Sequence, residues 1–306
     1  MSKPLYVILT AAQNEGRFIA NTIESVLGQS IVPLKWLIIS DGSTDDTDDI
    51  VQRYAKHHDF LTLVRRPRNR LPGFGSKAIA VNEAYSSLGH LPHAYVAILD
   101  SDVTLPPTYY EEVFGRFEQD ELLGVAGGVL CEILDGKRVM AKTSVDWSVS
   151  GAVQTFRRAC FEGIEGYRPV RKSIDGVADC MARMKGWRVR SFLEINAVHH
   201  RQMGTRNETV ARARFLNGVG YYAVGYHPLY MVVRCGARLG ERPVFTGSLL
   251  ELWGYLSQAL LRRPKDVPES YVRYARDEQL SRVFKTFGLL SLSRKLSPGL
   301  SPTDTP

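Results

Sequence analysis

The chain has little cysteine and no long apolar run, and both absences exclude classes of protein. Its 306 residues include four cysteines, widely spaced and without a C-x-x-C pair: Cys131, Cys160, Cys180 and Cys235. This spacing argues against a zinc site and against a disulfide framework, so we expect reduced thiols in a cytoplasmic protein. No segment offers about 18 consecutive apolar residues, which argues against a spanning helix.

A signal peptide is also not expected. Lys3 is followed by a short apolar run, residues 5–9, and then by the polar Gln13, Asn14 and Glu15. The hydrophobic share of 44% and the charged share of 23% are ordinary for a globular protein. A chain of this length can bury a large core, either as one large domain or as a domain with an appendage.

The net charge of +7 is unevenly distributed. Residues 201–306 hold 16 Lys/Arg and 8 Asp/Glu, whereas residues 1–200 hold 23 and 24. The basic excess therefore lies in the last third, and we expect the two parts to do different jobs.

Short apolar runs alternate with amphipathic ones through the first 120 residues. Strands are predicted at 5–12, 34–40, 61–66 and 94–99, and helices at 15–29, 43–58, 76–88 and 106–120, the second helix capped by Ser43 or Thr44. Such alternation predicts an α/β fold with a mostly parallel sheet covered on both faces. Ligands bind at the carboxyl ends of such strands, where Asn14, Asp41 and Asp100 fall.

The stretch "YVAILDSDVTLPP" ends a predicted buried strand in two like charges, Asp100 and Asp102. Carboxylates two residues apart repel each other unless a positive charge lies beside them. A divalent cation such as Mg²⁺ or Mn²⁺, which prefers hard oxygen ligands, would satisfy both. The alternative for the tripeptide alone is a solvated turn with helix-capping acids.

Five segments carry a resemblance to a known family. In chain order they read "TAAQNEGRFIANTIESVLGQS", "IISDGSTDDT", "AILDSDVTLPP", "GAVQTFRRACFEGIEGY" and "SIDGVADCMARMKGWRV". With them the first 200 residues resemble a family-2 glycosyltransferase of the GT-A fold, which has a Rossmann-like nucleotide-binding half. The last third resembles the tail of a smaller bacterial subgroup with "HHR…G" and "GYHPLY" stretches. We expect a catalytic domain at 1–204, a helical extension at 205–296 and a disordered tail at 297–306.

The resemblance implies transfer of a sugar from a nucleoside-diphosphate donor, expected to be a UDP-sugar, to an acceptor hydroxyl with inversion at the anomeric carbon. It also implies Mg²⁺ or Mn²⁺ on the diphosphate and a carboxylate base on the acceptor. The expected acceptor is a cell-surface glycan or a lipid-linked saccharide. Two alternatives stay open: a degenerate nucleotide-sugar or partner-binding protein, and a sugar nucleotidyltransferase, although "TAAQNEG" lacks the latter's Gly-rich loop.

The resemblance also assigns the donor site. Thr10, Asn14 and Glu15 would hold the nucleoside, with turn stabilisation as the alternative for Asn14. Asp41 would accept a hydrogen bond from the base, with helix capping as its alternative. Within Asp100–Ser101–Asp102, Asp102 would bind the metal directly, and Asp100 would contact the ribose or the metal through water.

Two basic segments are candidates for the donor phosphates. Lys77 lies just inside a predicted helix start, where backbone N–H groups also favour anions, but a solvated lysine is the alternative. "GFGSK" lacks the P-loop spacing. In "FRR" (156–158) one arginine would reach the diphosphate or else form a surface salt bridge.

The resemblance places the base at Asp175, where the family often has Glu-Asp and this chain has Ile174–Asp175. Asp179, four residues on and on the same helix face, is the alternative. The missing first acid leaves the orientation of Asp175 unexplained.

His199 and His200 follow the predicted strand 191–198, and in some relatives a histidine from this region completes the metal shell. Strand alternation would point the two side chains in opposite directions, so at most one should bind the metal. A structural hydrogen-bonding histidine is the alternative.

Residues 212–263 interleave aromatic residues with arginines such as Arg234, Arg238 and Arg242. This composition suits a peripheral segment at the anionic inner face of the cell membrane. It equally suits a helical subdomain packed on the core or on a second subunit. Nucleic-acid binding would leave the acidic strand ends unexplained, so we expect no nucleic-acid partner.

Overall fold

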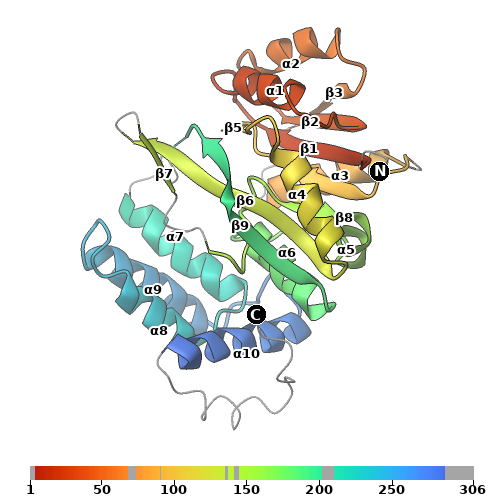
Figure 1. Cartoon of the computed structure of the whole chain (residues 1–306). Coiled ribbons are helices and arrows are strands. Elements are labelled where there is room, and N and C mark those ends of the chain that lie inside the picture. The colour runs from red at the N-terminus through yellow and green to blue at the C-terminus, as the bar shows by residue number, and fades with distance from the viewer. Residues whose placement is uncertain are drawn as a thin grey trace. The chain divides into compact units, whose positions relative to one another are not determined.

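The computed structural model describes residues 4–67, 74–89, 91–134, 137–140, 145–201 and 210–286 (Figure 1). Its contacts divide the chain into two compact units: Met1–Pro169 with Ile174–Met203, and Val170–Ser173 with Gly204–Pro306. The first is called the α/β unit below and the second the helical unit. The tail expected to be disordered, 297–306, lies outside the described residues.

The first half of the α/β unit is a parallel sheet in the strand order β3-β2-β1-β4. Its strands are β1 (Tyr6–Ala12), β2 (Lys35–Asp41), β3 (Leu61–Arg66) and β4 (Tyr95–Ile98), and the helices along them are α1 (Ile19–Leu27), α2 (Thr47–Ala55), α3 (Gly75–Ser87) and α4 (Tyr109–Gln119). Each predicted strand and helix of this half is present, which confirms the predicted parallel sheet with helices along it.

Burial explains why β1, β2 and β4 read as apolar runs, whereas β3 is only partly buried. Ile8 of β1 and Ile38 of β2 have no exposed surface, and α1 adds Ile19 and Ile23 from one face. Because helices cover the sheet, both faces of a strand need apolar side chains. The alternation of such runs with amphipathic segments was therefore enough to predict this half.

The start of α2 differs from the prediction. The helix begins at Thr47 after Asp46, and neither Ser43 nor Thr44 caps it. Asp45 Oδ1 instead accepts hydrogen bonds from the backbone N–H of Thr47 (3.1 Å) and from its hydroxyl (2.5 Å). The hydroxyl of Ser43 instead accepts a hydrogen bond from the N–H of Asn14. The residues before α2 therefore form a turn that contacts the loop after β1.

The second half of the sheet is mixed and continues from β4 in the order β8-β6-β9-β5, with β7 on the edge of β6. Its elements are β5 (Val103–Thr104), β6 (Leu123–Leu134), β7 (Lys137–Met140), β8 (Thr155–Arg157), β9 (Arg188–His199), α5 (Arg158–Gly163) and α6 (Ile174–Met184). β8 pairs antiparallel with β4 and β6, while β6 and β9 run parallel. The α/β fold class is confirmed, with parallel pairing concentrated in the first half.

The short strand β5 begins directly after the Asp100–Asp102 segment. It pairs antiparallel with the end of β9, where Val103 lies opposite His199. The backbone N–H of His200 also donates to the carbonyl of Asp102 at 2.9 Å. This pairing fixes two segments that are far apart in the sequence against each other.

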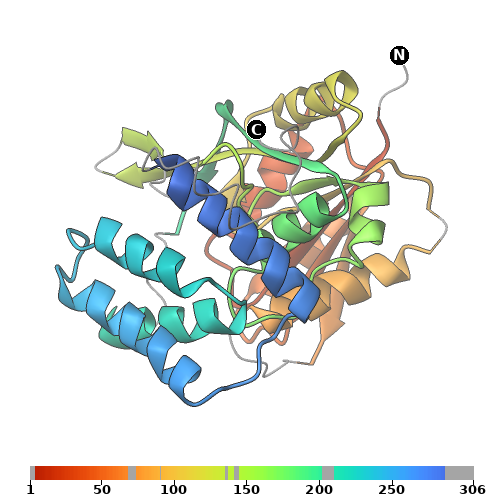
Figure 2. The same ribbon diagram turned by 90° about the horizontal axis from the view of Figure 1, so that it is seen from below.

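The helical unit consists of α7 (Val210–Ala223), α8 (Pro228–Ala237), α9 (Thr246–Leu260) and α10 (Glu269–Thr286) in the described residues (Figure 2). Helices α7 and α9 cross closely at two glycines, Gly218 and Gly254. A Cβ at Gly218 would lie 1.8 Å from the Glu251 carbonyl oxygen, and one at Gly254 2.1 Å from that of Phe215. Among the described residues, no helix combines the length and apolar character needed to cross a membrane.

We predict that Gly254→Ala destabilises the helical unit. The added methyl would overlap backbone atoms of α7, which cannot move as a side chain can, and overpacking of this kind costs about 1–3 kcal/mol. Denaturant unfolding followed by circular dichroism measures the loss. Gly236→Ala in α8, where a Cβ has no neighbour within 4 Å, is the matched control. Equal stability of the two variants would contradict this close crossing.

Candidate functional site

Asp100 lies at the end of β4 in a ring of polar contacts. Its carboxylate pairs with the Lys77 ammonium, which also donates to the Gly151 carbonyl at 3.0 Å. Its backbone N–H donates to the carbonyl of Ala152 at 3.0 Å. Lys77 is therefore not a freely solvated side chain, and a phosphate bound near Asp100 would meet its charge. The phosphate role itself stays a prediction.

Asp102 is largely buried and lies between two cationic groups. Its Oδ1 is 3.3 Å from His199 Nε2, and its Oδ2 is 3.6 Å from Arg201 Nε. Burial opposes the charge on Asp102, but the hydrogen bond from His199 and the positive charges outweigh it, so the pKa of Asp102 is lowered. Burial likewise opposes the imidazolium, yet Asp102 raises the pKa of His199 overall. Each side chain therefore favours the charged form of the other.

Arg201 is a site residue that the sequence reasoning missed. Its guanidinium pairs with Glu15 as well as approaching Asp102, and it lies 5.5 Å from the centre of the Phe18 ring. It thus joins the loop after β1 to the loop after β4. The signal that was available was its place in the "HHR" triplet, directly after the two histidines.

The two histidines have different surroundings. His200 Nε2 lies 3.0 Å from the hydroxyl of Thr104, and its ring stacks 6.2 Å from that of Phe18. His199 faces Asp102, and its Nδ1 is buried with no hydrogen-bond partner. The alternation expected for a strand separates the pair, which leaves His199 as the histidine placed to join Asp102 on a cation.

Asp102 and His199 fit a metal ion that takes its remaining ligands from a bound substrate and water. No group of three or more His, Cys, Asp or Glu side chains able to hold a metal occurs among the described residues. Asp102 and His199 provide one carboxylate and one imidazole nitrogen about the same point. Mg²⁺ in phosphate-transfer sites is commonly held by one or two protein ligands plus substrate oxygens and water. Two protein ligands are thus sufficient for a cation that arrives with a diphosphate.

Hydrogen bonds join the loop after β1 to the loop after β2. Asn14 adopts a left-handed backbone (φ 54°), and its side-chain oxygen accepts from the Thr44 N–H at 2.8 Å. Its own N–H donates to the Ser43 hydroxyl at 3.2 Å, and the N–H of Glu15 donates to the Thr47 hydroxyl at 2.7 Å. Asn14 therefore has the turn-stabilising role that was left open. Nucleoside contacts by Asn14 and Glu15 stay predictions.

The other predicted donor residues have distinct environments. Thr10 is completely buried and accepts a hydrogen bond from Trp36 Nε1 at 3.0 Å, so we leave it out of the proposed site. Asp41 ends β2, accepts from the Ser76 hydroxyl and lies 3.4 Å from Arg66 Nε. Ser101 is buried, and its carbonyl accepts from the Thr22 hydroxyl. Base recognition by Asp41 stays a prediction.

Asp175 and Asp179 both lie on α6 but differ in exposure. Asp175 is partly exposed and accepts from the N–H groups of Gly151 (3.1 Å) and Gly176 (2.9 Å). Asp179 has no exposed surface. An acceptor hydroxyl could approach the first carboxylate but not the second. The geometry thus favours Asp175 over Asp179 as the base. The two backbone N–H donors also orient the Asp175 carboxylate, although no acid precedes it in the sequence.

Gly151 links Asp100, through Lys77, to the candidate base Asp175. Its carbonyl accepts from Lys77, the partner of Asp100, and its N–H donates to Asp175. A Cβ at this position would lie 2.9 Å from the Asp175 Cβ, so a side chain would push the carboxylate away. The role of Gly151 was not anticipated from the sequence, where it is one glycine among 26.

Asp179 holds the segment that carries Gly151. Its carboxylate accepts from the Ser148 hydroxyl (2.7 Å), the Val149 N–H (2.9 Å) and Gln154 Nε2 (2.7 Å), and Gln154 in turn accepts from Tyr167. Burial raises the pKa of Asp179 to about 7, although Arg183 and these donors favour the ionised form. Asp179 is a positioning residue beneath the site.

The two arginines of "FRR" have structural contacts. Arg157 donates to the carbonyls of Phe117 (2.9 Å) and Leu123 (3.2 Å), and Arg158 pairs with Glu162 at 2.8 Å. The salt-bridge alternative therefore describes Arg158.

A parallel α/β half with acidic residues at its strand ends defines the general class of this protein, and comparison gives the family. The family described as Glycosyl transferase family 2 matches residues 7–192. The chain belongs to this family, which confirms the prediction of a glycosyltransferase at that level. The match ends before the last third, so the proposed subgroup resemblance of that part stays a prediction.

Curated relatives match over part of their lengths. A putative teichuronic acid biosynthesis glycosyltransferase, TuaG of Bacillus subtilis, is 37% identical over 100 residues, covering 33% of this chain and 36% of the relative. Poly-beta-1,6-N-acetyl-D-glucosamine synthase of Staphylococcus epidermidis is 29% identical over 155 residues, covering 51% and 33%. The chain thus spans well under two thirds of the length of these relatives.

Solved structures share the fold. Mannosyltransferase PcManGT from Pyrobaculum calidifontis, in complex with GDP-Man and Mn²⁺, superposes with a TM-score of 0.56 at 17% identity, over 98% of this chain and 82% of that one. S. aureus TarS 1–349 with UDP-GlcNAc gives 0.52 at 12% identity, over 95% and 87%. At such identities the likeness concerns the fold, and it confirms the GT-A type.

We predict that the stability difference between Asp179→Asn and the wild type depends on pH. The native pKa of Asp179, about 7, lies above the ordinary value of 3.8, so folding takes up a proton between these values. The wild-type free energy of unfolding therefore falls as pH rises from about 4 to 7, and the variant, which cannot ionise, escapes this fall. Denaturant unfolding across this range measures it.

The difference should move in favour of the variant as pH rises. Asp59→Asn, at an exposed residue outside the site, is the control for removing a carboxylate. A pH-independent difference for Asp179→Asn would show that Asp179 is already ionised throughout this range.

Proposed function

We propose that this protein is an inverting glycosyltransferase that moves a sugar from a nucleoside diphosphate, a UDP-sugar, to an acceptor hydroxyl. The observation that carries the proposal is the chain of contacts from Asp100 through Lys77 and Gly151 to Asp175, with Asp102 two residues beyond Asp100. Family membership over 7–192 supports the reaction class, and TarS with UDP-GlcNAc supports a uridine donor.

In the proposed site, Asp102 and His199 hold Mg²⁺ or Mn²⁺, and PcManGT with Mn²⁺ supports this assignment. The bound cation would supply Lewis-acid neutralisation of the leaving diphosphate. Lys77 adds a second positive charge on the Asp100 side, and Asp41 and Glu15 line the nucleoside end. His199 rather than His200 is the proposed ligand.

Asp175 is the proposed base. The acceptor oxygen forms a bond to the anomeric carbon as the carbon–oxygen bond to the diphosphate breaks, and that bonding pair leaves with the diphosphate. The hydroxyl proton passes to the Asp175 carboxylate. Attack from the face opposite the leaving group inverts the anomeric carbon. The N–H of Gly151 fixes the direction of the carboxylate, so little reorganisation is needed.

The proposed acceptor is a cell-surface glycan or a lipid-linked saccharide. Its support is the relatives, which are named for teichuronic acid and poly-N-acetylglucosamine synthesis. We place the reaction at the cytoplasmic face of a membrane, where nucleotide sugars and lipid-linked acceptors would meet, and we retain the division into a catalytic part and a helical extension near residue 204.

Metal dependence is the first test of this proposal. Calorimetry of UDP binding should show affinity that falls at least tenfold when EDTA replaces Mg²⁺ or Mn²⁺, because two diphosphate charges then lose their counter-ion. Asp102→Asn should weaken binding similarly in the presence of metal. Equal affinity with and without EDTA would rule out the proposed cation.

Asp175→Asn tests the chemistry separately. Donor affinity should stay near the wild-type value while turnover falls on the order of 10²-fold or more, since a positioned base contributes that much. Turnover with an acceptor, and UDP release without one, are the two measurements. Glu162→Gln, on an exposed face of α5, is the matched control.

Unchanged turnover in Asp175→Asn would remove Asp175 as the base. No UDP release by the wild type from any donor, with binding intact, would instead favour a degenerate nucleotide-sugar-binding protein.

A further inference from the structure

Helix α9 exposes an apolar stripe on the face away from α7. Its members follow helical spacing, with exposed fractions of 60% for Leu249, 57% for Trp253, 39% for Leu256 and 74% for Leu260. The opposite face, which includes Gly247, Glu251 and Gly254, is buried. Charged residues would be expected on the outer face of a helix that only packs on its own unit. An exposed tryptophan among leucines instead indicates an interaction surface.

Phe245, the residue before α9, extends the apolar stripe and has a strained backbone conformation. Phe245 has a positive φ of 57°, which is rare for a residue with a Cβ, and its side chain is 62% exposed. The N–H of Leu249 donates to its carbonyl at 3.1 Å, which holds it against the first turn of α9. A strained backbone that displays an aromatic ring to solvent is a feature of recognition sites.

Basic residues flank both ends of the stripe. Arg242 precedes it, Arg262 and Arg263 follow it, and all three are exposed. Glu251 is the one acid between residues 242 and 263, and it is buried. The surface is therefore apolar in the middle and positive at both ends, and the neighbouring Glu241 is paired with Arg214 and Arg238.

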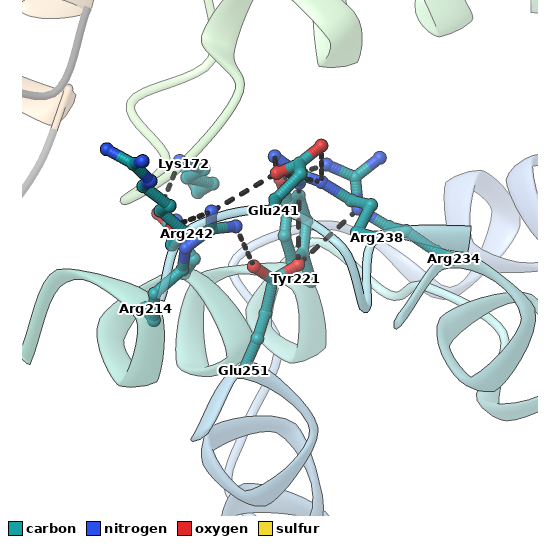
Figure 3. A network of polar contacts seen from close by, with 9 residues as sticks. Lys172, Arg214, Tyr221, Arg234, Arg238, Glu241, Arg242 and Glu251 are labelled. Atoms are coloured by element: carbon teal, nitrogen blue, oxygen red, sulfur yellow. Dashed lines mark hydrogen bonds and ion pairs between the residues drawn. The ribbon is translucent and has the colours of Figure 1, made fainter. Parts of the chain in front are cut away.

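The arginines first expected to meet lipid are engaged inside the helical unit (Figure 3). Arg234 and Arg238 lie 3.5 and 3.8 Å from Glu251, and Arg238 also pairs with Glu241 at 2.8 Å. Arg242 points its side chain away from Glu251 (Figure 3). Arg234 and Arg238 thus balance the buried carboxylate of Glu251, and only Arg242 of the three expected residues belongs to the exposed surface.

We propose that the α9 face, defined as Phe245, Leu249, Trp253, Leu256 and Leu260 with Arg242, Arg262 and Arg263, docks on an anionic lipid surface. The apolar side chains enter the boundary between headgroups and acyl chains, and the arginines meet anionic headgroups. This inference rests on the proposed function, because docking on lipid would hold the enzyme beside a lipid-linked acceptor.

Charge distinguishes this occupant from a second copy of the chain. Pairing two α9 faces would bring arginines of one copy against arginines of the other, in a parallel or an antiparallel arrangement, because both ends of the stripe are basic. Like charges opposed across an interface are costly. An anionic membrane instead satisfies both ends at once.

The test uses the full-length protein and vesicles of phosphatidylcholine, either alone or mixed with the anionic lipid phosphatidylglycerol. The protein should co-sediment with the anionic vesicles, and binding should weaken with salt because exposed charges are screened within about 8–10 Å. Brominated lipid should quench Trp253, compared with a Trp253→Phe variant that isolates its signal from the other tryptophans.

Two variants and a matched control make the test specific. Leu249→Ser with Leu260→Ser, and Arg242→Gln with Arg262→Gln and Arg263→Gln, should each reduce vesicle binding at least tenfold. Arg53→Gln with Lys56→Gln and Lys185→Gln removes the same charge from exposed residues of the α/β unit and should bind normally. Circular dichroism confirms folding of each variant.

The outcomes separate this inference from the proposed function. Loss of vesicle binding with UDP release intact in the leucine and arginine variants supports the α9 face. A wild-type protein that stays in the supernatant while it transfers sugar would overturn the docking proposal and leave the enzyme proposal standing. Sedimentation velocity covers the other occupant: a dimer that Leu249→Ser with Leu260→Ser dissociates, without lipid binding, would also overturn it.

Discussion

The antiparallel pairing of β5 with the end of β9 is the contact on which the site depends. It places Val103 opposite His199 and so sets Asp102, His199 and Arg201 in one cluster. The buried carboxylate needs positive charge, and the strand end supplies two cationic groups. A cation with a diphosphate would take over that role. The pairing therefore serves charge balance as well as the closure of the sheet.

A second constraint is that the proposed base, Asp175, must be fixed without a neighbouring acid. The segment 148–154 does this through backbone groups, with Gly151 bonded to both Lys77 and Asp175. Asp179 anchors that segment from below through three hydrogen bonds. Two aspartates on one helix face thus have separate tasks, and burial is the physical difference between them.

The arginines of the helical unit also fall into two groups that differ in burial. Those facing inward neutralise Glu251, a carboxylate that would otherwise be costly to bury. Those at the ends of α9 stay exposed beside an apolar stripe. Basic composition alone did not distinguish these two groups, because the distinction depends on which side of a helix each residue lies and on what packs there.

The sequence by itself determined that the first half is a parallel sheet, because buried strands must be apolar and their alternation with helices favours parallel pairing. It also singled out Asp100, Asp102 and Asp175 by motif as candidate site residues. Only the tertiary structure decided that Arg201 joins Asp102, that His199 rather than His200 faces it, and that Arg234 and Arg238 turn inward. Each of these depends on contacts between segments distant in sequence, and local patterns carry no record of such contacts.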